Sequence, residues 1–106
     1  MSFPLPHPAT RAIVALGRDL SLARRRRRLS QASMAERMGV SLATLKRLEK
    51  GDPRVALESV ARALYVLGEI RRLDSLLETR DDALGLTLMD SQLPLRVRAR
   101  KTSGAM

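Results

Sequence analysis

Apolar residues recur every three or four positions through most of the chain, which is the spacing of one helix face and predicts an all-α fold. The pattern predicts five helices, over residues 10–28, 31–38, 42–50, 56–67 and 69–78. The apolar positions from which these helices can build a core are Ile13, Leu16, Leu20, Ala23, Met34, Ala35, Met38, Leu45, Leu48, Leu57, Val60, Ala63, Leu64, Leu67, Ile70, Leu73, Leu76 and Leu77.

The segment 30–51 has the local signals of two helices joined by a tight turn. Ser30 and Ser41 each precede a helical stretch and are preferred N-cap residues. Gly39 lies between the two helices, and Gly51 lies where the second should end, both positions that favour a left-handed residue. Two short helices with a glycine-containing turn are typical of a helix-turn-helix.

The second helix of this pair presents polar and small residues on its outward side. Leu45 and Leu48 are predicted to face the core. The outward positions, with Leu42 at the boundary, are Ala43, Thr44, Lys46, Arg47 and Lys50. Basic side chains beside small ones allow a helix to enter the major groove of DNA. An ordinary solvated helix face is the alternative interpretation.

The two ends of the chain are expected to lie outside the helical domain. Residues 1–9 contain three prolines and are predicted to form a flexible arm, in which His7 is a solvated residue rather than a ligand. The helical domain spans 10–78, and an apolar segment for dimerisation or partner binding follows at 79–93. Residues 94–106 are predicted to be a disordered basic tail.

A short extra helix is predicted over 83–92. Leu84 and Leu88 fit helical spacing, although the alternation of Leu84, Leu86 and Leu88 also fits a strand. Helix is favoured because an aspartate precedes the segment and Pro94 follows it. An apolar segment outside a small core usually meets a partner, either a second copy or another protein. Packing back onto its own domain is the alternative.

The net charge of the chain indicates which kind of molecule it binds. The chain has 20 Lys and Arg against 11 Asp and Glu, a net charge of +9, which points to a polyanion such as nucleic acid. Aromatic residues are nearly absent, so base stacking on single-stranded RNA is not favoured. With one histidine, no cysteine and no carboxylate cluster, we expect no enzyme activity, metal or cofactor. No apolar stretch long enough for a membrane span occurs, so we expect a cytoplasmic protein.

The run of five arginines at 24–28 ends the first predicted helix. Five successive residues cover more than one helical turn, so they cannot form a single patch. Arg24 lies near the apolar face and the others point outward. Two interpretations remain open, namely phosphate contact by one or two of them, or a solvated face that complements the helix dipole.

Residues 16–68 resemble the XRE/Cro-type helix-turn-helix domain of phage repressors and many bacterial regulators. The matching residues are Leu16, Gly17, Leu20, Arg24, Leu29, Ser30, Gln31, Ala35, Gly39, Val40, Ser41, Leu45, Leu48, Glu49, Gly51, Ala63, Leu64, Leu67 and Gly68. The fifth helix, apolar segment, proline and arginine-rich end are similar to the HipB-like antitoxins that accompany HipA-type kinase toxins.

The resemblance implies a five-helix fold of the lambda-repressor type with a short extra C-terminal helix and a basic tail. It also implies a sequence-specific transcription regulator, a repressor, that binds a pseudo-palindromic operator in double-stranded DNA as a homodimer at the nucleoid. A HipA-like kinase is the implied protein partner. The alternative function is a protein-interaction module, a toxin-neutralising or adaptor protein, for which DNA binding is secondary.

The residues that the resemblance and the outward face assign to DNA binding are Ser30, Gln31, Ser41, Leu42, Ala43, Thr44, Lys46, Arg47, Lys50 and Arg54. Gln31 matches a glutamine that contacts phosphate and supports a base-contacting residue. Leu42 and Ala43 stand where relatives often carry polar residues, which leaves contacts to thymine methyl groups there. Lys46 and Arg47 are then the expected guanine contacts.

The resemblance assigns a structural role to two charged residues. Arg24 and Glu49 match a pair that forms an internal salt bridge between helices in phage repressors of this type. They are therefore expected to stabilise the fold rather than to contact DNA.

Overall fold

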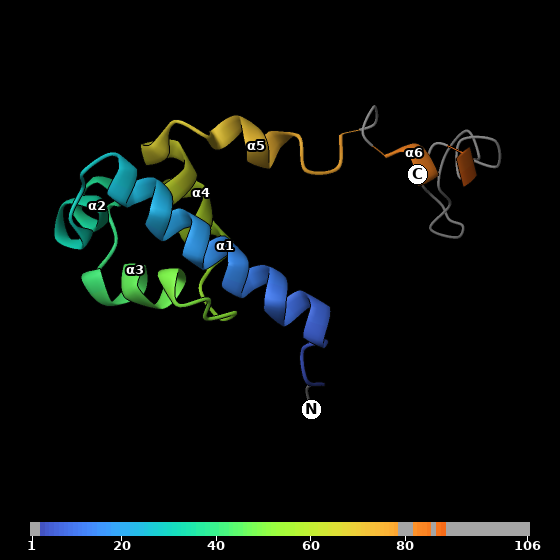
Figure 1. The fold of residues 1–106 in the computed structure, drawn as a ribbon, viewed down its shortest axis with the longest axis horizontal. Helices are drawn as coiled ribbons and strands as arrows, with labels where there is room; N and C mark the ends of the chain where they lie inside the picture. Colours follow the sequence, from blue (N-terminus) through green and yellow to red (C-terminus); the bar gives the residue numbers. More distant parts are fainter. Residues whose placement is uncertain (1–2, 79–81, 86, 89–106) are drawn as a thin grey trace, which may run out of the picture. The chain divides into compact units, whose positions relative to one another are not determined.

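The computed structural model describes residues 3–78, 82–85 and 87–88, which contain helices and no strand (Figure 1). The helices are α1 His7–Arg26, α2 Gln31–Met38, α3 Leu42–Glu49, α4 Leu57–Leu67, α5 Ile70–Asp74 and α6 Ala83–Gly85. The chain divides into two compact units, Met1–Leu73 and Asp74–Met106, and the first unit holds the core described below. The predicted all-α fold is confirmed.

The core lies where α1, α2, α3 and α4 meet. Its buried side chains are Leu20, Met34, Ala35, Met38, Leu45, Leu48, Ala63 and Leu67. Met34, Met38 and Leu45 are each 1% exposed, so α2 and α3 supply the largest fully buried side chains. Burial of this kind stabilises a helix pair whose helices are too short to be stable alone.

Glycine allows α1 to approach α3 closely. A Cβ atom added to Gly17 would lie 2.5 Å from the carbonyl oxygen of Leu48, and one added to Gly51 would lie 2.7 Å from the Cα of Val14. The two backbones therefore touch with no side chain between them. Leu16, predicted to face the core, is instead 38% exposed, because Gly17 and Leu20 occupy the contact side of α1.

The N-terminal prediction was wrong about where the first helix begins. α1 starts at His7 instead of Thr10, so the predicted arm is shorter than residues 1–9. Pro6 occupies the N-cap and Pro8 the first turn, where a missing N–H removes no helical hydrogen bond. The N–H of Thr10 donates to the carbonyl oxygen of Pro6 at 3.0 Å and closes the first turn.

A residue with left-handed backbone follows each of the first four helices, and in one case it is not a glycine. Left-handed residues follow α2, α3 and α4 at Gly39, Gly51 and Gly68, and the same place after α1 is taken by Arg28 with φ 57°. Behind α1, the N–H of Arg28 donates to the Arg25 carbonyl at 2.9 Å and that of Leu29 to the Arg24 carbonyl at 3.2 Å. This is the Schellman pattern, formed with a residue that pays a steric penalty there.

The C-terminal half departs from the predicted boundaries. α4 begins at Leu57 with no side-chain cap at Ala56, and Leu57 is 69% exposed rather than inward. α5 is shorter than the predicted 69–78, and Leu76 and Leu77 beyond it are exposed. Of the predicted helix 83–92, the described residues show only the short helix α6, Ala83–Gly85. Residues 86 and 89–92 lie outside the described residues, as do 79–81 and the predicted tail 94–106.

None of the described helices is both long and apolar enough to cross a bilayer.

Candidate nucleic-acid interface

Both helices of the helix-turn-helix begin with a serine cap. The Ser30 hydroxyl accepts a hydrogen bond from the N–H of Ser33 at 3.0 Å, and the Ser41 hydroxyl accepts one from the N–H of Thr44 at 3.1 Å. Ser41 also donates to the Thr44 hydroxyl at 2.9 Å. The caps fix the first turns of α2 and α3, whose remaining N–H groups are the ones suited to an anion such as a phosphate.

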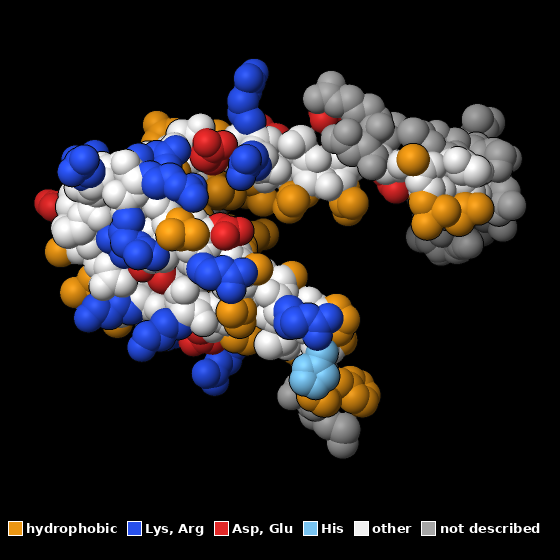
Figure 2. Space-filling model, in the orientation of Figure 1, with side chains coloured by type: hydrophobic (Ala, Val, Ile, Leu, Met, Phe, Trp, Pro, Cys, Tyr) orange, Lys and Arg blue, Asp and Glu red, His pale blue; other side chains and the backbone are white. Residues whose placement is uncertain are grey.

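The outward side of α3 carries the predicted contact residues together. Leu45 and Leu48 point into the core, while Ala43, Lys46 and Arg47 are exposed and Leu42 is 40% exposed. Lys50, also exposed, follows at the C-cap, and Thr44 is half-buried, with its hydroxyl accepting a hydrogen bond from Ser41. Figure 2 shows basic side chains along the lower edge of the first unit, where Figure 1 places α3.

A buried ion pair holds α3 against α1 and α2. The Arg24 Nε lies 2.7 Å from Glu49 Oε2, and the two side chains are 10% and 6% exposed. Arg24 also donates to the Leu29 carbonyl at 2.8 Å, and the Gln31 amide donates to Glu49 Oε1 at 2.9 Å. The implied Arg24–Glu49 pair is present, and Gln31 extends it into a network across three helices. The predicted contact of Gln31 with phosphate stays a prediction.

An open pocket lies beside this network. It is lined by Ser21, Gln31, Lys46, Glu49 and Lys50, so residues of α1, α2 and α3 meet there. The Glu49 charge is already paired with Arg24, whereas Lys46 and Lys50 are exposed. The pocket therefore presents positive charge outward, which suits a phosphate or the edge of a base.

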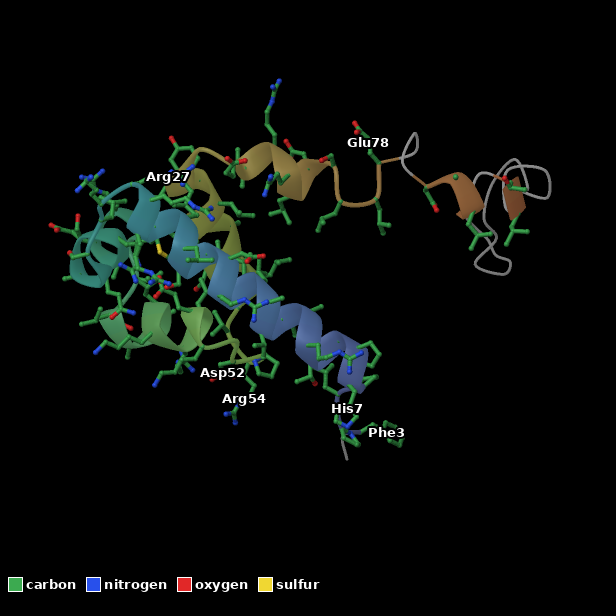
Figure 3. All side chains as sticks on the ribbon, in the orientation of Figure 1. Phe3, His7, Arg27, Asp52, Arg54 and Glu78 are labelled. Atoms are coloured by element: carbon green, nitrogen blue, oxygen red, sulfur yellow. The ribbon has the colours of Figure 1, made fainter. Side chains whose placement is uncertain are left out.

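An acidic residue stands among the basic ones at the end of α3. Asp52 Oδ1 accepts from the backbone N–H of Arg54 at 2.9 Å and lies 3.4 Å from its Nε, and Asp52 Oδ2 is 4.0 Å from Arg47 Nη1. The Arg54 backbone hydrogen bond lowers the pKa of the Asp52 carboxyl, and the charges of Arg54 and Arg47 lower it further. Figure 3 shows Asp52 and Arg54 next to each other in the loop after α3.

A family model described as a helix-turn-helix domain matches residues 15–86, which include α2, α3 and the whole site. The chain belongs to this helix-turn-helix family. The prediction of a helix-turn-helix DNA-binding protein is thereby confirmed, and the similarity to HipB-like antitoxins stays a prediction. No curated protein and no solved structure gave a match.

The five arginines at 24–28 of this helix-turn-helix protein differ in burial, because successive helical residues point in different directions. Arg24 is buried, and the next four arginines are exposed. Arg25 donates to the Ser21 carbonyl at 3.4 Å and Arg27 to the Ala23 carbonyl at 2.8 Å. These bonds to the last turns of α1 support the interpretation in which the run complements the helix dipole.

Two residues position the helix-turn-helix in ways that helical spacing alone does not indicate. Gly17 gives α3 its place against α1, and Arg62 of α4 donates to the Met38 carbonyl at the end of α2 at 3.0 Å. Arg62 is itself held by Glu58, 2.9 Å away. The (i, i+4) spacing of Glu58 and Arg62 was visible in the sequence and indicates a helical ion pair, but not its contact with α2.

Among the described residues no group of three or more His, Asp or Glu side chains is arranged to hold a metal ion.

Proposed function

We propose that this protein is a sequence-specific transcription regulator that inserts α3 into the major groove of double-stranded DNA. The observation that carries the proposal is the two-sided character of α3. Its apolar side is buried through Leu45 and Leu48, while Lys46 and Arg47 are exposed beside the small residue Ala43. A rigid helix with that outward side fits the groove and offers donors to guanine.

Each candidate residue has a role in this proposal. Lys46 and Arg47 donate to guanine, while Leu42 and Ala43 meet thymine methyl groups. Ser30, Gln31, Ser41 and Thr44 position the helix starts on the phosphate backbone, and Lys50 and Arg54 add phosphate contacts. The Arg24–Glu49 pair, 2.7 Å between charged atoms, contacts no DNA and fixes the angle of α3.

We further propose that the protein is a cytoplasmic, nucleoid-associated repressor that binds DNA as a homodimer. A single helix-turn-helix buries little DNA surface, and two copies on a pseudo-palindrome place their α3 helices about one helical turn of DNA apart. The exposed leucines of the second unit, Leu76, Leu77, Leu84 and Leu88, offer apolar surface for pairing.

The same leucines favour the second candidate function, a toxin-neutralising or adaptor protein that keeps DNA binding as a secondary role. In the HipB-like version, these residues contact a HipA-type kinase and the complex represses its own promoter. Co-expression of the full chain with a HipA-type kinase encoded beside it tests this version. Recovery of a stable complex that Leu76→Asp with Leu84→Asp abolishes supports it, and separate elution of the two chains contradicts it.

Selection of duplexes from a randomised pool by the full chain tests the main proposal. We expect enrichment of one motif with two inverted half-sites, and footprinting of the protein's own promoter should show protection over a matching sequence. Lys46→Ala with Arg47→Ala should abolish the enrichment, whereas Arg37→Ala, an exposed arginine of α2, should keep it. A pool without enrichment after selection by the wild-type chain would contradict sequence-specific binding.

A further inference from the structure

The carboxylate of Asp52 contacts two of the arginines that the proposed function assigns to DNA. Its Oδ1 lies 3.4 Å from Arg54 Nε, and its Oδ2 lies 4.0 Å from Arg47 Nη1. The arginine side chains are 87% and 52% exposed, but that of Asp52 is only 17% exposed. Asp52 is therefore the fixed member of the cluster, and the two cations are the members free to turn toward another anion.

The backbone holds this carboxylate in place. The N–H of Asp52 donates to the Arg47 carbonyl at 3.0 Å as part of the turn that ends α3, and Asp52 Oδ1 accepts from the Arg54 N–H at 2.9 Å. The position of Asp52 relative to α3 is thus set by a main-chain bond to Arg47 and by a bond from the Arg54 N–H to its carboxylate, and neither bond involves an arginine side chain.

Two features of the location oppose a carboxylate, and the Arg54 N–H together with the charges of Arg54 and Arg47 offsets them and lowers the pKa of Asp52. The C-terminal end of a helix carries partial negative charge, which disfavours an anion next to it. A carboxylate on a DNA-facing surface also repels phosphate. An asparagine would form the same turn with Arg54 without either cost, since its side-chain oxygen is also a hydrogen-bond acceptor. The charge itself is then the feature to explain.

We propose that Asp52 is a specificity-determining residue that competes with DNA phosphate for Arg47 and Arg54. On DNA of arbitrary sequence the carboxylate keeps these arginines partly occupied and lowers affinity. On the cognate sequence, the Asp52 carboxylate holds Arg47 extended along the groove side of α3 for a bidentate contact with guanine. That contact offsets the repulsion between the carboxylate and the DNA phosphates. Asp52 therefore acts through the two arginines as a positioning residue.

The measurement is the salt dependence of binding by Asp52→Asn, which keeps the turn and removes the charge. Affinity of the full chain for a short duplex of scrambled sequence is measured between about 50 and 200 mM salt. Log affinity falls with log salt, and each phosphate neutralised makes this slope more negative by about 0.9. We expect tighter binding by roughly 3- to 10-fold at low salt and a slope steeper by about 1 to 2, one for each arginine released.

Glu58→Gln is the matched control, because it changes the net charge equally beside Arg62, which is not assigned to DNA. The glutamine oxygen can still accept from Arg62, and Arg62 keeps its own hydrogen bond to the Met38 carbonyl, so α2 stays in place. It should leave the slope unchanged. For the duplex selected by the wild-type chain, Asp52→Asn should gain less affinity than for the scrambled duplex, so the ratio of the two affinities falls. Melting temperatures of both variants near that of wild type show that folding is intact.

The inference rests on the proposed function, and the outcomes separate the two. If the wild-type chain binds neither duplex, the proposed function fails and the role of Asp52 fails with it. If the wild-type chain prefers the selected duplex but Asp52→Asn matches Glu58→Gln in slope and in affinity ratio, only the role of Asp52 is overturned. A steeper slope with a reduced ratio supports it.

Discussion

Replacing Glu49 by alanine should destabilise the protein more than any surface charge change. The substitution leaves Arg24 as a charge with a 10% exposed side chain and removes the acceptor used by Gln31. Breaking a buried ion pair from one side costs about 3–5 kcal/mol. Arg24 keeps its hydrogen bond to the Leu29 carbonyl at 2.8 Å, which places the expected cost near the lower end, at about 3 kcal/mol.

Thermal unfolding followed by circular dichroism measures this cost. For a domain of this size each kcal/mol corresponds to about 4–8 °C, so we expect the melting temperature to fall by at least about 10 °C. Glu58→Ala is the control, since it breaks an ion pair whose side chains are 47% and 71% exposed. An exposed helical pair contributes only about 0.3–0.5 kcal/mol, so this variant should melt within a few degrees of wild type.

A double variant separates the cost of the stranded Arg24 charge from the cost of lost side-chain volume. Arg24→Met with Glu49→Leu removes both charges and keeps apolar bulk, so it should recover most of the stability lost by Glu49→Ala. If Glu49→Ala melts no lower than Glu58→Ala, the network does not hold α3. If the double variant is as unstable as the single one, the cause is packing and not a stranded charge.

Four further predictions concern other sites. Arg28→Gly should raise the free energy of unfolding by about 0.5–1 kcal/mol, because glycine adopts φ 57° without the steric penalty, and this gain exceeds the backbone entropy that glycine loses on folding. An unchanged denaturation midpoint would contradict this. Gly17→Ala should lower it by about 1–3 kcal/mol, because the new Cβ would meet the Leu48 carbonyl oxygen at 2.5 Å; chemical denaturation measures it, and neutrality would refute the close contact. Arg47→Ala should weaken binding to the selected duplex by about 1–3 kcal/mol at fixed salt, and unchanged affinity in a titration would remove Arg47 from the contact set. Because the pKa of Asp52 is lowered in the fold, its contribution to stability is present above about pH 3.9 and is lost as pH falls through the folded value; Asp52→Asn should therefore lose less stability than wild type on acidification below that pH, as followed by unfolding at several pH values.

The helix-turn-helix could be predicted because its signals are local. Serine caps at Ser30 and Ser41 and a left-handed glycine at Gly39 act within one turn of the backbone. The buried positions of α2 and α3 follow from helical spacing alone, since both helices are short and amphipathic. The Arg24–Glu49 pair joins residues far apart in the chain, and it came from the family resemblance and not from spacing.

The remaining features depend on contacts that spacing does not encode. The start of α1 was misplaced because prolines discourage a helix in general but are tolerated in its first turn, as at Pro8. The exposure of Leu16 follows from the close approach at Gly17, which requires the position of α3 to be known. The spacing of apolar residues assigns no role to Asp52, because its contacts with Arg47 and Arg54 arise only once the turn after α3 has formed.

The central claim is that the exposed side of α3 distinguishes DNA sequences. The most direct test is the ratio of affinities of the full wild-type chain for the selected duplex and for a scrambled duplex of equal length, at one salt concentration. Specific helix-turn-helix binding predicts a ratio of about 10³ or more, which Lys46→Ala with Arg47→Ala should bring close to one. Equal affinity of the wild-type chain for the two duplexes would contradict the claim.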